Sequence, residues 1–400
     1  MPIYYMELEA LQIMITVSEK ILFFNKSRTF FIQIFLFRFS EIVALVSLST
    51  TFFLFIHTRD LNIRLAENAQ FEASVSGSAS AIGQGESSLN KDRRIEAERL
   101  ADLELYGKLD PMELNNTRKA VKETLFFNRV PKVGSQTTME LLKSLAIKNN
   151  FHYHKDRTQK VETIKLSNSE QKHLSKLVNS FSPPSVYVKH VCFTNFTKYG
   201  LPMPIYVNMV RDPVERVISW YYYVRAPWYF VERKRAFPDL PLPNPNWLRK
   251  DFETCVRTND PECRYLPAMK RDGFGDHRRQ TMFFCGHEED CTGFNTEVAM
   301  KKAKENVERH YAVVGVLEEL NKTLTVLEHY VPRFFKGALE TYWNEVHIFS
   351  KINRNLYKPK VEEATKDIVR QNFTRELEFF DFCKQRLHKQ YLAITLNQDP

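Results

Sequence analysis

The segment LFFNRVPKVGSQTT, residues 125–138, decides the fold class of this chain. Its three leading apolar residues suit a short buried strand, and from Met139 onward apolar residues recur at helical spacing. A strand, a Gly-containing loop and a helix in this order suit phosphate binding, because backbone N–H groups point outward at a helix start and the helix dipole attracts negative charge. The candidate phosphate ligands are Lys132, Val133, Gly134, Ser135, Gln136, Thr137 and Thr138.

The Walker nucleotide loop is one alternative for this segment. It places its Lys after a second Gly, whereas Lys132 precedes the only Gly of the loop, so the Walker motif is absent. An ordinary structural turn explains the loop equally well when the loop is taken alone.

A second segment, PIYVNMVRDPVERVIS at residues 204–219, has the same order of strand and helix. Asp212 is expected to cap the helix, with Pro213 at the first helical position and Glu215 completing a capping box. Arg211 then lies at the carboxyl end of a strand, where open parallel sheets bind their ligands. The two segments together predict an α/β fold with a mostly parallel sheet.

These two segments resemble a known family. PKVGSQTT resembles the 5′-phosphosulfate loop of sulfotransferases that use 3′-phosphoadenosine 5′-phosphosulfate (PAPS), and RDPVERVIS resembles their 3′-phosphate site. Over roughly residues 125–394 the chain is similar to the uronyl and heparan sulfate 2-O-sulfotransferases, also through FFCG, VVGVLEEL and PRFF. The resemblance implies the P-loop-like sulfotransferase fold, PAPS as co-substrate and no metal.

The resemblance also implies roles for single residues. Lys132 matches the Lys that stabilises the oxygen between sulfate and 5′-phosphate, while Arg211 and Ser219 match the 3′-phosphate pair. His190, in the segment SVYVKHVCFTNF, matches the second His of a His-x-His pair and is the expected base. Val188 replaces the first His, which puts a heparan-type acceptor site in doubt. Without the family, a lone His on an apolar strand is more often structural.

Basic residues predict an anionic acceptor. The net charge is +9, which favours a nucleotide, an acidic polysaccharide, a membrane surface or a nucleic acid as partner. The alternative is that these residues lie in solvated basic loops without a ligand. Single-stranded nucleic acid is disfavoured as a partner, because the N-terminal part of the chain, described next, predicts a lumenal location. The residues expected to bind acidic sugar groups are Arg129, Arg225, Arg233, Lys234 and Arg235, with Arg278 and Arg279 as further candidates, and Lys351, Arg354 and Lys358 are expected to close over the nucleotide.

The N-terminal part predicts a membrane anchor. Residues 39–56 read FSEIVALVSLSTTFFLFI, close to the length that spans a bilayer, although a buried core helix is the alternative. Basic residues precede this run, so residues 1–38 are expected to stay cytosolic and the rest to be lumenal. Residues 57–120 are then a stem rich in Ser and Gly, and residues 121–400 form the sulfotransferase domain.

Cysteines and glycosylation triplets agree with the secretory pathway. Cys255 lies close to Cys263, and Cys285 lies close to Cys291, as local disulfides do, whereas neither spacing is the C-x2-C of a zinc site. Four glycosylation triplets follow the predicted anchor, and they begin at Asn115, Asn195, Asn321 and Asn372. Cys192 and Cys383 are left over. We therefore expect a Golgi type II membrane protein.

The sequence thus predicts transfer of a sulfuryl group from PAPS to the 2-hydroxyl of a uronic acid in a glycosaminoglycan or related glycan. A homotrimer is the assembly that the resemblance suggests. A lumenal carbohydrate-binding pseudoenzyme of the same fold is the alternative. A metal-dependent glycosyltransferase is disfavoured, because the chain lacks Asp-x-Asp.

Overall fold

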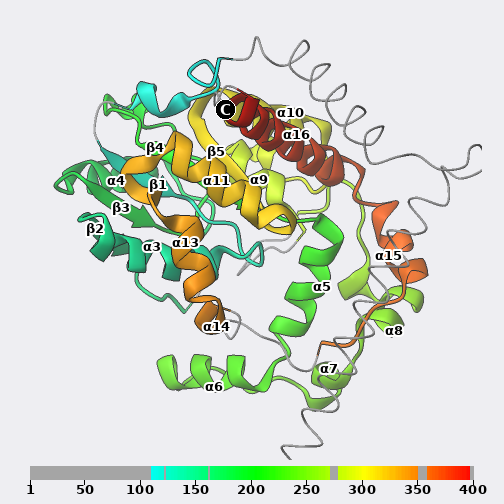
Figure 1. The fold of residues 1–400 in the computed structure, drawn as a ribbon. Coiled ribbons are helices and arrows are strands. Elements are labelled where there is room, and N and C mark those ends of the chain that lie inside the picture. The colour runs from blue at the N-terminus through cyan, green and yellow to red at the C-terminus, as the bar shows by residue number, and fades with distance from the viewer. Residues whose placement is uncertain (1–109, 121–122, 161–162, 271–277, 350–357, 397–400) are drawn as a thin grey trace, which may run out of the picture. The chain divides into compact units, whose positions relative to one another are not determined.

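A parallel sheet forms the centre of the fold (Figure 1). The computed structural model describes residues 110–120, 123–160, 163–270, 278–349 and 358–396. Within them five strands pair in the order β2-β3-β1-β4-β5, and every pair is parallel. The strands are β1 (Thr124–Phe127), β2 (His152–Lys155), β3 (Ser185–Val188), β4 (Ile205–Val210) and β5 (Tyr311–Val316).

The central position of β1 determines where the candidate site lies. Phe126 pairs in register with Tyr187 of β3 on one side and Tyr206 of β4 on the other. Its ring packs on both tyrosines, with centroids 5.7 and 5.3 Å away. Because all strands are parallel, the segments that follow β1, β3 and β4 emerge at one edge of the sheet. The loops that carry Lys132, His190 and Arg211 are therefore neighbours.

Helices surround the sheet (Figure 1). Helices α11 and α16 pack on β5, and α3 packs against α12 and α13. The helices are α3 (Ser135–Lys148), α4 (Asn168–Ser180), α5 (Pro213–Tyr223), α6 (Pro227–Ala236), α7 (Pro245–Arg249), α8 (Phe252–Arg257), α9 (Gln280–Cys285), α10 (Glu297–His310), α11 (Leu320–Tyr330), α12 (Pro332–Phe335), α13 (Ala338–Asn344), α14 (Val346–Phe349), α15 (Glu363–Arg370) and α16 (Thr374–Leu396). Short 3₁₀ helices are η1 (Asn116–Lys119), η2 (Phe196–Tyr199), η3 (Pro261–Cys263), η4 (Glu289–Cys291) and η5 (Leu317–Glu319).

The predicted strands and helices at the two candidate phosphate-binding segments are confirmed, as is the parallel α/β sheet. The Asp212 cap is also confirmed, because its Oδ1 accepts a hydrogen bond from Glu215 N at 2.9 Å. The reciprocal half of the capping box is wrong. Asp212 N donates instead to Glu318 Oε1 at 3.1 Å, and the Glu215 carboxylate faces cations from elsewhere in the fold.

The boundary between stem and domain needs a correction. Asn116 of η1 is buried, and its Nδ2 donates to the carbonyl oxygens of Glu308 and Tyr311, both at 2.8 Å. Packing onto the domain therefore begins before residue 121. The predicted cytosolic tail, the anchor at residues 39–56 and most of the stem lie outside the described residues. Among the helices of the described ranges, none is long and apolar enough to cross a membrane.

Both predicted cysteine pairs form disulfides. Cys255 is joined to Cys263, and Cys285 is joined to Cys291. Cys192 and Cys383 are buried outside these bonds. In the described part of the chain, one group holds three potential metal ligands, namely Cys255, Asp260 and Glu262. Its sulfur belongs to a disulfide and is no thiolate, so this group is a poor metal site.

Candidate active site

The loop after β1 has the backbone of an anion cradle. Lys132 and Gly134 both have positive φ, 66° and 78°. Gly134 is the N-cap of α3 and supplies no side-chain cap, so the first N–H groups of the helix remain open to an anion. A Cβ at Gly134 would lie 2.6 Å from Leu317 Cδ1. Glycine is therefore favoured here by conformation, and a Cβ would also force the Leu317 side chain to shift.

Buried polar side chains hold this loop in place by hydrogen bonds. The Arg216 side chain is 1% exposed, and its Nε donates to Pro131 O at 2.9 Å. Asn208 Nδ2 donates to Asn128 O at 2.8 Å, and Tyr311 Oη donates to Asn128 Oδ1 at 3.0 Å. These bonds tie the loop to β4, β5 and α5, so its shape does not depend on a bound ligand.

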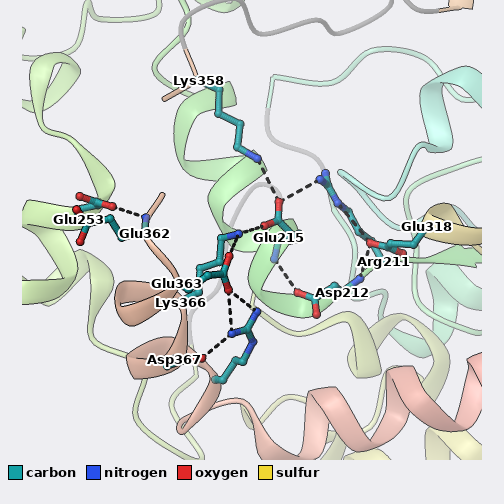
Figure 2. Close-up of polar contacts among 11 residues, drawn as sticks. Arg211, Asp212, Glu215, Glu253, Glu318, Lys358, Glu362, Glu363, Lys366 and Asp367 are labelled. Carbon is teal, nitrogen blue, oxygen red and sulfur yellow. Dashed lines mark hydrogen bonds and ion pairs between the residues drawn. The ribbon is translucent and has the colours of Figure 1, made fainter. Parts of the chain in front are cut away.

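Arg211 lies beside the loop with its hydrogen-bonding capacity only partly used (Figure 2). Its Nη1 donates to Lys132 O at 3.4 Å. Its nearest carboxylate oxygens belong to Glu215 at 3.5 Å and Glu318 at 3.9 Å, both longer than a strong charge-assisted bond. Within the described residues, Arg211 Nε is buried and has no hydrogen-bond partner. An anion that reached this guanidinium would satisfy it.

Two lysines from the C-terminal part of the chain reach the same place. Lys358 Nζ lies 3.3 Å from Glu215 Oε2, and Lys366 Nζ of α15 lies 3.0 Å from Glu215 Oε1 (Figure 2). Burial and the charges of Arg211 and Lys366 lower the pKa of Lys358, against the attraction of Glu215. The sequence predicts that Lys358 closes over the nucleotide, and in the structure this lysine faces the same Glu215 carboxylate as Arg211. Lys351 and Arg354 lie outside the described residues.

Lys132 stands at the junction of these cations. Its Nζ lies 3.7 Å from the centre of the Tyr223 ring, a cation–π contact. Burial, followed by the charges of Arg211, Lys358 and Arg129, lowers the pKa of Lys132 to about 7. Such mutual repulsion means that the site holds more positive charge than its own carboxylates neutralise. It is suited to a ligand with several negative charges.

His190 lies just beyond β3, and Arg129 holds its ring at both nitrogens. Arg129 Nε donates to His190 Nε2 at 2.8 Å, and His190 Nδ1 lies 2.8 Å from Arg129 O. Burial, followed by the charge of Arg129, holds the pKa of His190 well below its ordinary value. The imidazole is therefore neutral at physiological pH, the protonation state that a general base needs.

A cleft of about 290 Å³ opens beside His190. Five basic side chains and two acidic side chains, those of Asp156 and Glu232, line it. Tyr223 and Tyr229 add an aromatic wall, and Tyr223 also carries Lys132 on its ring. The cleft therefore adjoins the cation cluster and suits an acidic, sugar-sized group. The basic residues are Arg129, Lys155, Arg157, Lys189 and Arg233.

Three residues that were predicted to bind the acceptor are buried inside the protein, so the prediction of an acceptor contact is wrong for them. Arg225 is 3% exposed, lies over the rings of Tyr221 and Trp247, and pairs with Glu262 at 2.7 Å. Arg278 and Arg279 are each 2% exposed and donate to backbone carbonyl groups. Their charges are used to hold loops together, so we remove them from the acceptor site.

The other predicted acceptor residues divide between the cleft and the surface. Arg129 and Arg233 line the cleft with His190. Lys234 and Arg235 are exposed on α6 and do not line this cleft, and Lys234 Nζ donates to Leu240 O at 2.7 Å. One face of α6 therefore meets the cleft while the next residues face solvent.

The predicted phosphate-loop residues also divide by side-chain direction. The Val133 side chain is fully buried, so only its backbone offers a donor. Gln136, predicted as a nucleotide ligand, lines the cleft beside His190. The Thr138 hydroxyl donates to Gly134 O at 3.3 Å. Three of the predicted ligands carry hydroxyl groups in the first turn of α3, namely Ser135, Thr137 and Thr138. Ser219 lies on α5, which follows Arg211.

Several site residues were missed by sequence reasoning. Tyr223, Glu318 and Lys366 are each far in sequence from the residues they contact, and Glu215 meets Lys358 and Lys366 from the C-terminal part of the chain. Tyr223 ends helix α5 on the side opposite the buried face formed by Val214, Ile218 and Tyr221, so the apolar pattern gave no signal for it.

Three of the four glycosylation triplets have an Asn whose side-chain oxygen already accepts a hydrogen bond. Asn115 and Asn195 accept from the backbone N–H of the Thr two residues later, at 2.9 and 3.1 Å. Asn321 is exposed on α11 and accepts from Trp343 Nε1 at 3.0 Å. Asn372 lies between α15 and α16 and donates to Ile368 O at 3.3 Å. Glycosylation at these sites stays a prediction.

Comparison with known proteins agrees with this geometry. The model of the sulfotransferase family matches residues 116–383, a range that contains both candidate phosphate-binding segments and His190. The chain belongs to this sulfotransferase family.

Individual curated proteins show which members of this family the chain is similar to. The chain is 44% identical over 285 residues to the uronyl 2-sulfotransferase homolog pip of Drosophila melanogaster, covering 70% of this chain and 55% of that protein. It is 31% identical to heparan sulfate 2-O-sulfotransferase 1 of Xenopus laevis, covering 66% of this chain and 70% of that one. It is 30% identical to human uronyl 2-sulfotransferase, with 66% and 62% covered. The chain thus spans about half of the length of the Drosophila protein. The predicted resemblance to these 2-O-sulfotransferases is confirmed.

Proposed function

We propose that this chain transfers a sulfuryl group from PAPS to the 2-hydroxyl of a uronic acid residue in a glycosaminoglycan or related acidic glycan. The observation that carries the proposal is the meeting of three features at one sheet edge. These are an open helix N-terminus at Gly134, an under-satisfied Arg211 and a neutral His190 in a basic cleft.

The donor set fits PAPS. A nucleotide with a 3′-phosphate and a 5′-phosphosulfate carries several negative charges at two separate places. The N–H groups of α3 and Lys132 suit the 5′ end, and Arg211 with Ser219 suits the 3′-phosphate. Lys358 lies 3.3 Å from the carboxylate of Glu215 that Arg211 also faces, so we assign it to the 3′-phosphate as well. When bound, PAPS supplies the activated sulfuryl group.

The chain's own residues supply positioning and proton transfer. His190 Nε2 takes the proton of the attacking hydroxyl, which is too weak a nucleophile at neutral pH to react unaided. Lys132 stabilises the negative charge that develops on the oxygen leaving with the 5′-phosphate. The low dielectric of a buried site strengthens this contact, and the developing negative charge raises the pKa of Lys132 from about 7 back toward its ordinary value.

We also propose that the chain works in the lumen of the Golgi, anchored by residues 39–56, and as a homotrimer. Two disulfides support an oxidising compartment. The names of the relatives support a glycosaminoglycan acceptor.

The test uses the full chain, labelled PAPS and a panel of native and desulfated glycosaminoglycans, with mapping of the product disaccharides. Label at the 2-position of a uronic acid is expected. Transfer to none of them with PAPS still bound would favour an uncommon glycan acceptor or a glycan-binding pseudoenzyme. Absence of PAPS binding would refute the sulfotransferase assignment.

Two substitutions separate the roles. His190→Ala is expected to abolish transfer while affinity for the nucleotide stays within about twofold, since His190 bonds to Arg129, whose side chain faces the acceptor cleft, and not to Lys132 or Arg211. Loss of nucleotide binding in this variant would make His190 structural. Arg211→Ala is the opposite case, with nucleotide binding lost first.

A further inference from the structure

One residue, Arg129, occupies both nitrogens of the proposed base. Its guanidinium Nε lies 2.8 Å from His190 Nε2, and its backbone oxygen lies 2.8 Å from His190 Nδ1. A guanidinium has only donors, so Nε2 is the acceptor of the first contact. The ring proton is therefore on Nδ1, which donates to the Arg129 carbonyl. The tautomer follows from the two contacts together.

This arrangement has a chemical consequence. A neutral imidazole has a single lone pair in the ring plane, here on Nε2, and that lone pair already accepts the Arg129 N–H. A hydroxyl of an acceptor cannot donate to the same lone pair until Arg129 leaves it. The base is masked in the free enzyme.

We propose that Arg129 is a gate that the acceptor opens. A carboxylate next to the reacting hydroxyl binds the Arg129 guanidinium, draws it away from His190 and frees Nε2 at the moment when the hydroxyl is in place. This inference rests on the proposed function and deepens it: the enzyme selects acidic sugars because a neutral sugar leaves its base masked.

The surroundings of Arg129 favour such an exchange. Arg129 and His190 line the same cleft, whose basic residues outnumber its acidic ones. Arg129 Nη1 reaches Gln136 Oε1 at 3.4 Å, a long bond, and also contacts Met139 Sδ, a weak acceptor. A carboxylate can accept two parallel N–H bonds from the guanidinium and carries a full opposite charge, whereas the neutral imidazole accepts one bond, so the carboxylate wins the competition.

The transfer step balances with this change. The hydroxyl oxygen forms a bond to sulfur, the bond from sulfur to the 5′-phosphate oxygen breaks, and the hydroxyl proton moves to Nε2. The electron pair leaves with 3′-phosphoadenosine 5′-phosphate. The Nδ1–H group of the imidazolium keeps its bond to the Arg129 carbonyl, because only the side chain of Arg129 has moved. Lys189 and Arg216 are the other charged groups that lower the pKa of His190.

The test compares the best acidic acceptor of the panel with its carboxyl-reduced form, in which carboxylates are primary alcohols and ring hydroxyls are kept. The full chain is assayed with labelled PAPS, and only label at the 2-position is counted. We expect the wild type to sulfate the reduced acceptor roughly 100-fold more slowly at saturation, the effect of one lost charge-assisted contact.

Arg129→Met distinguishes a gate from a simple binding residue. Methionine keeps the apolar length but has no N–H to place on Nε2. If Arg129 only bound the carboxylate, this variant would leave the reduced acceptor unaffected. A gate predicts a gain: Arg129→Met sulfates the reduced acceptor about tenfold faster than the wild type does, the effect of one hydrogen bond removed from the base. Lys155→Met is the matched control, since Lys155 lines the same cleft without touching His190 and its loss should slow both acceptors alike.

A second measurement does not depend on turnover. Diethyl pyrocarbonate attacks imidazole nitrogens with a free lone pair, and mass spectrometry reports its reaction at His190 relative to the exposed His329 of the same chain. Arg129→Met should raise the relative rate at His190 severalfold. Equal sulfation of both acceptors by the wild type, or unchanged His190 reactivity in Arg129→Met, overturns the proposal. If the wild type sulfates no acceptor at all, the proposed function fails, while the reactivity still decides whether the base is masked.

Discussion

Nucleotide binding is expected to add a proton to Lys132. Burial and neighbouring cations lower the pKa of this lysine to about 7 in the free protein, so it is about half charged at pH 7 and about one-tenth charged at pH 8. A bound anion at the loop restores the full charge. Binding of 3′-phosphoadenosine 5′-phosphate therefore takes up about half a proton at pH 7 and about 0.9 proton at pH 8.

The same linkage sets the pH dependence of affinity. The charged form binds and its share falls as pH rises, so the Lys132 contribution weakens binding about tenfold between pH 6 and pH 8, or about 1.4 kcal/mol. Isothermal calorimetry in two buffers with different heats of ionisation measures the proton uptake directly.

The control is Lys132→Arg, which keeps a cation at every pH because guanidinium does not titrate in this range. Protonation of the nucleotide's own phosphates affects both proteins equally and cancels in the comparison. If the wild type and Lys132→Arg take up the same number of protons at pH 8, the depressed pKa of Lys132 is refuted.

Three further substitutions test the fold and the site. Gly134→Ala should lower the free energy of unfolding by about 1–3 kcal/mol more than Gly200→Ala, because both glycines have positive φ but only Gly134 faces Leu317, at 2.6 Å; equal losses in urea denaturation would contradict this. Arg211→Ala should weaken nucleotide binding at least about tenfold by calorimetry, and unchanged affinity would remove it from the site. Arg225→Met should cost about 3 kcal/mol of stability yet leave the KM for the acceptor unaltered below the unfolding transition; a raised KM would return Arg225 to the acceptor site.

Local patterns were enough to predict the elements that carry the site. A short apolar run, a positive-φ glycine and an amphipathic helix each depend on neighbours in sequence, so β1, α3 and the Asp212 cap were predictable. The second half of the capping box was not. Glu215 has the right spacing for it, but Lys366 and Lys358, brought in from the C-terminal part of the chain, attract its carboxylate more strongly than a backbone N–H does.

By itself the sequence determined the class of fold, the phosphate loop, the family and the identity of His190 as the candidate base, because these depend on short patterns and on residues in a fixed order. Only the tertiary structure decided which cations serve the site. Arg225 and Arg233 are eight residues apart with the same charge, yet one is buried against Trp247 and the other lines the cleft. The contact between Arg129 and His190 joins residues 61 positions apart. It exists because β1 and β3 are adjacent and parallel, and strand order is a property of the whole packed sheet that no local pattern specifies.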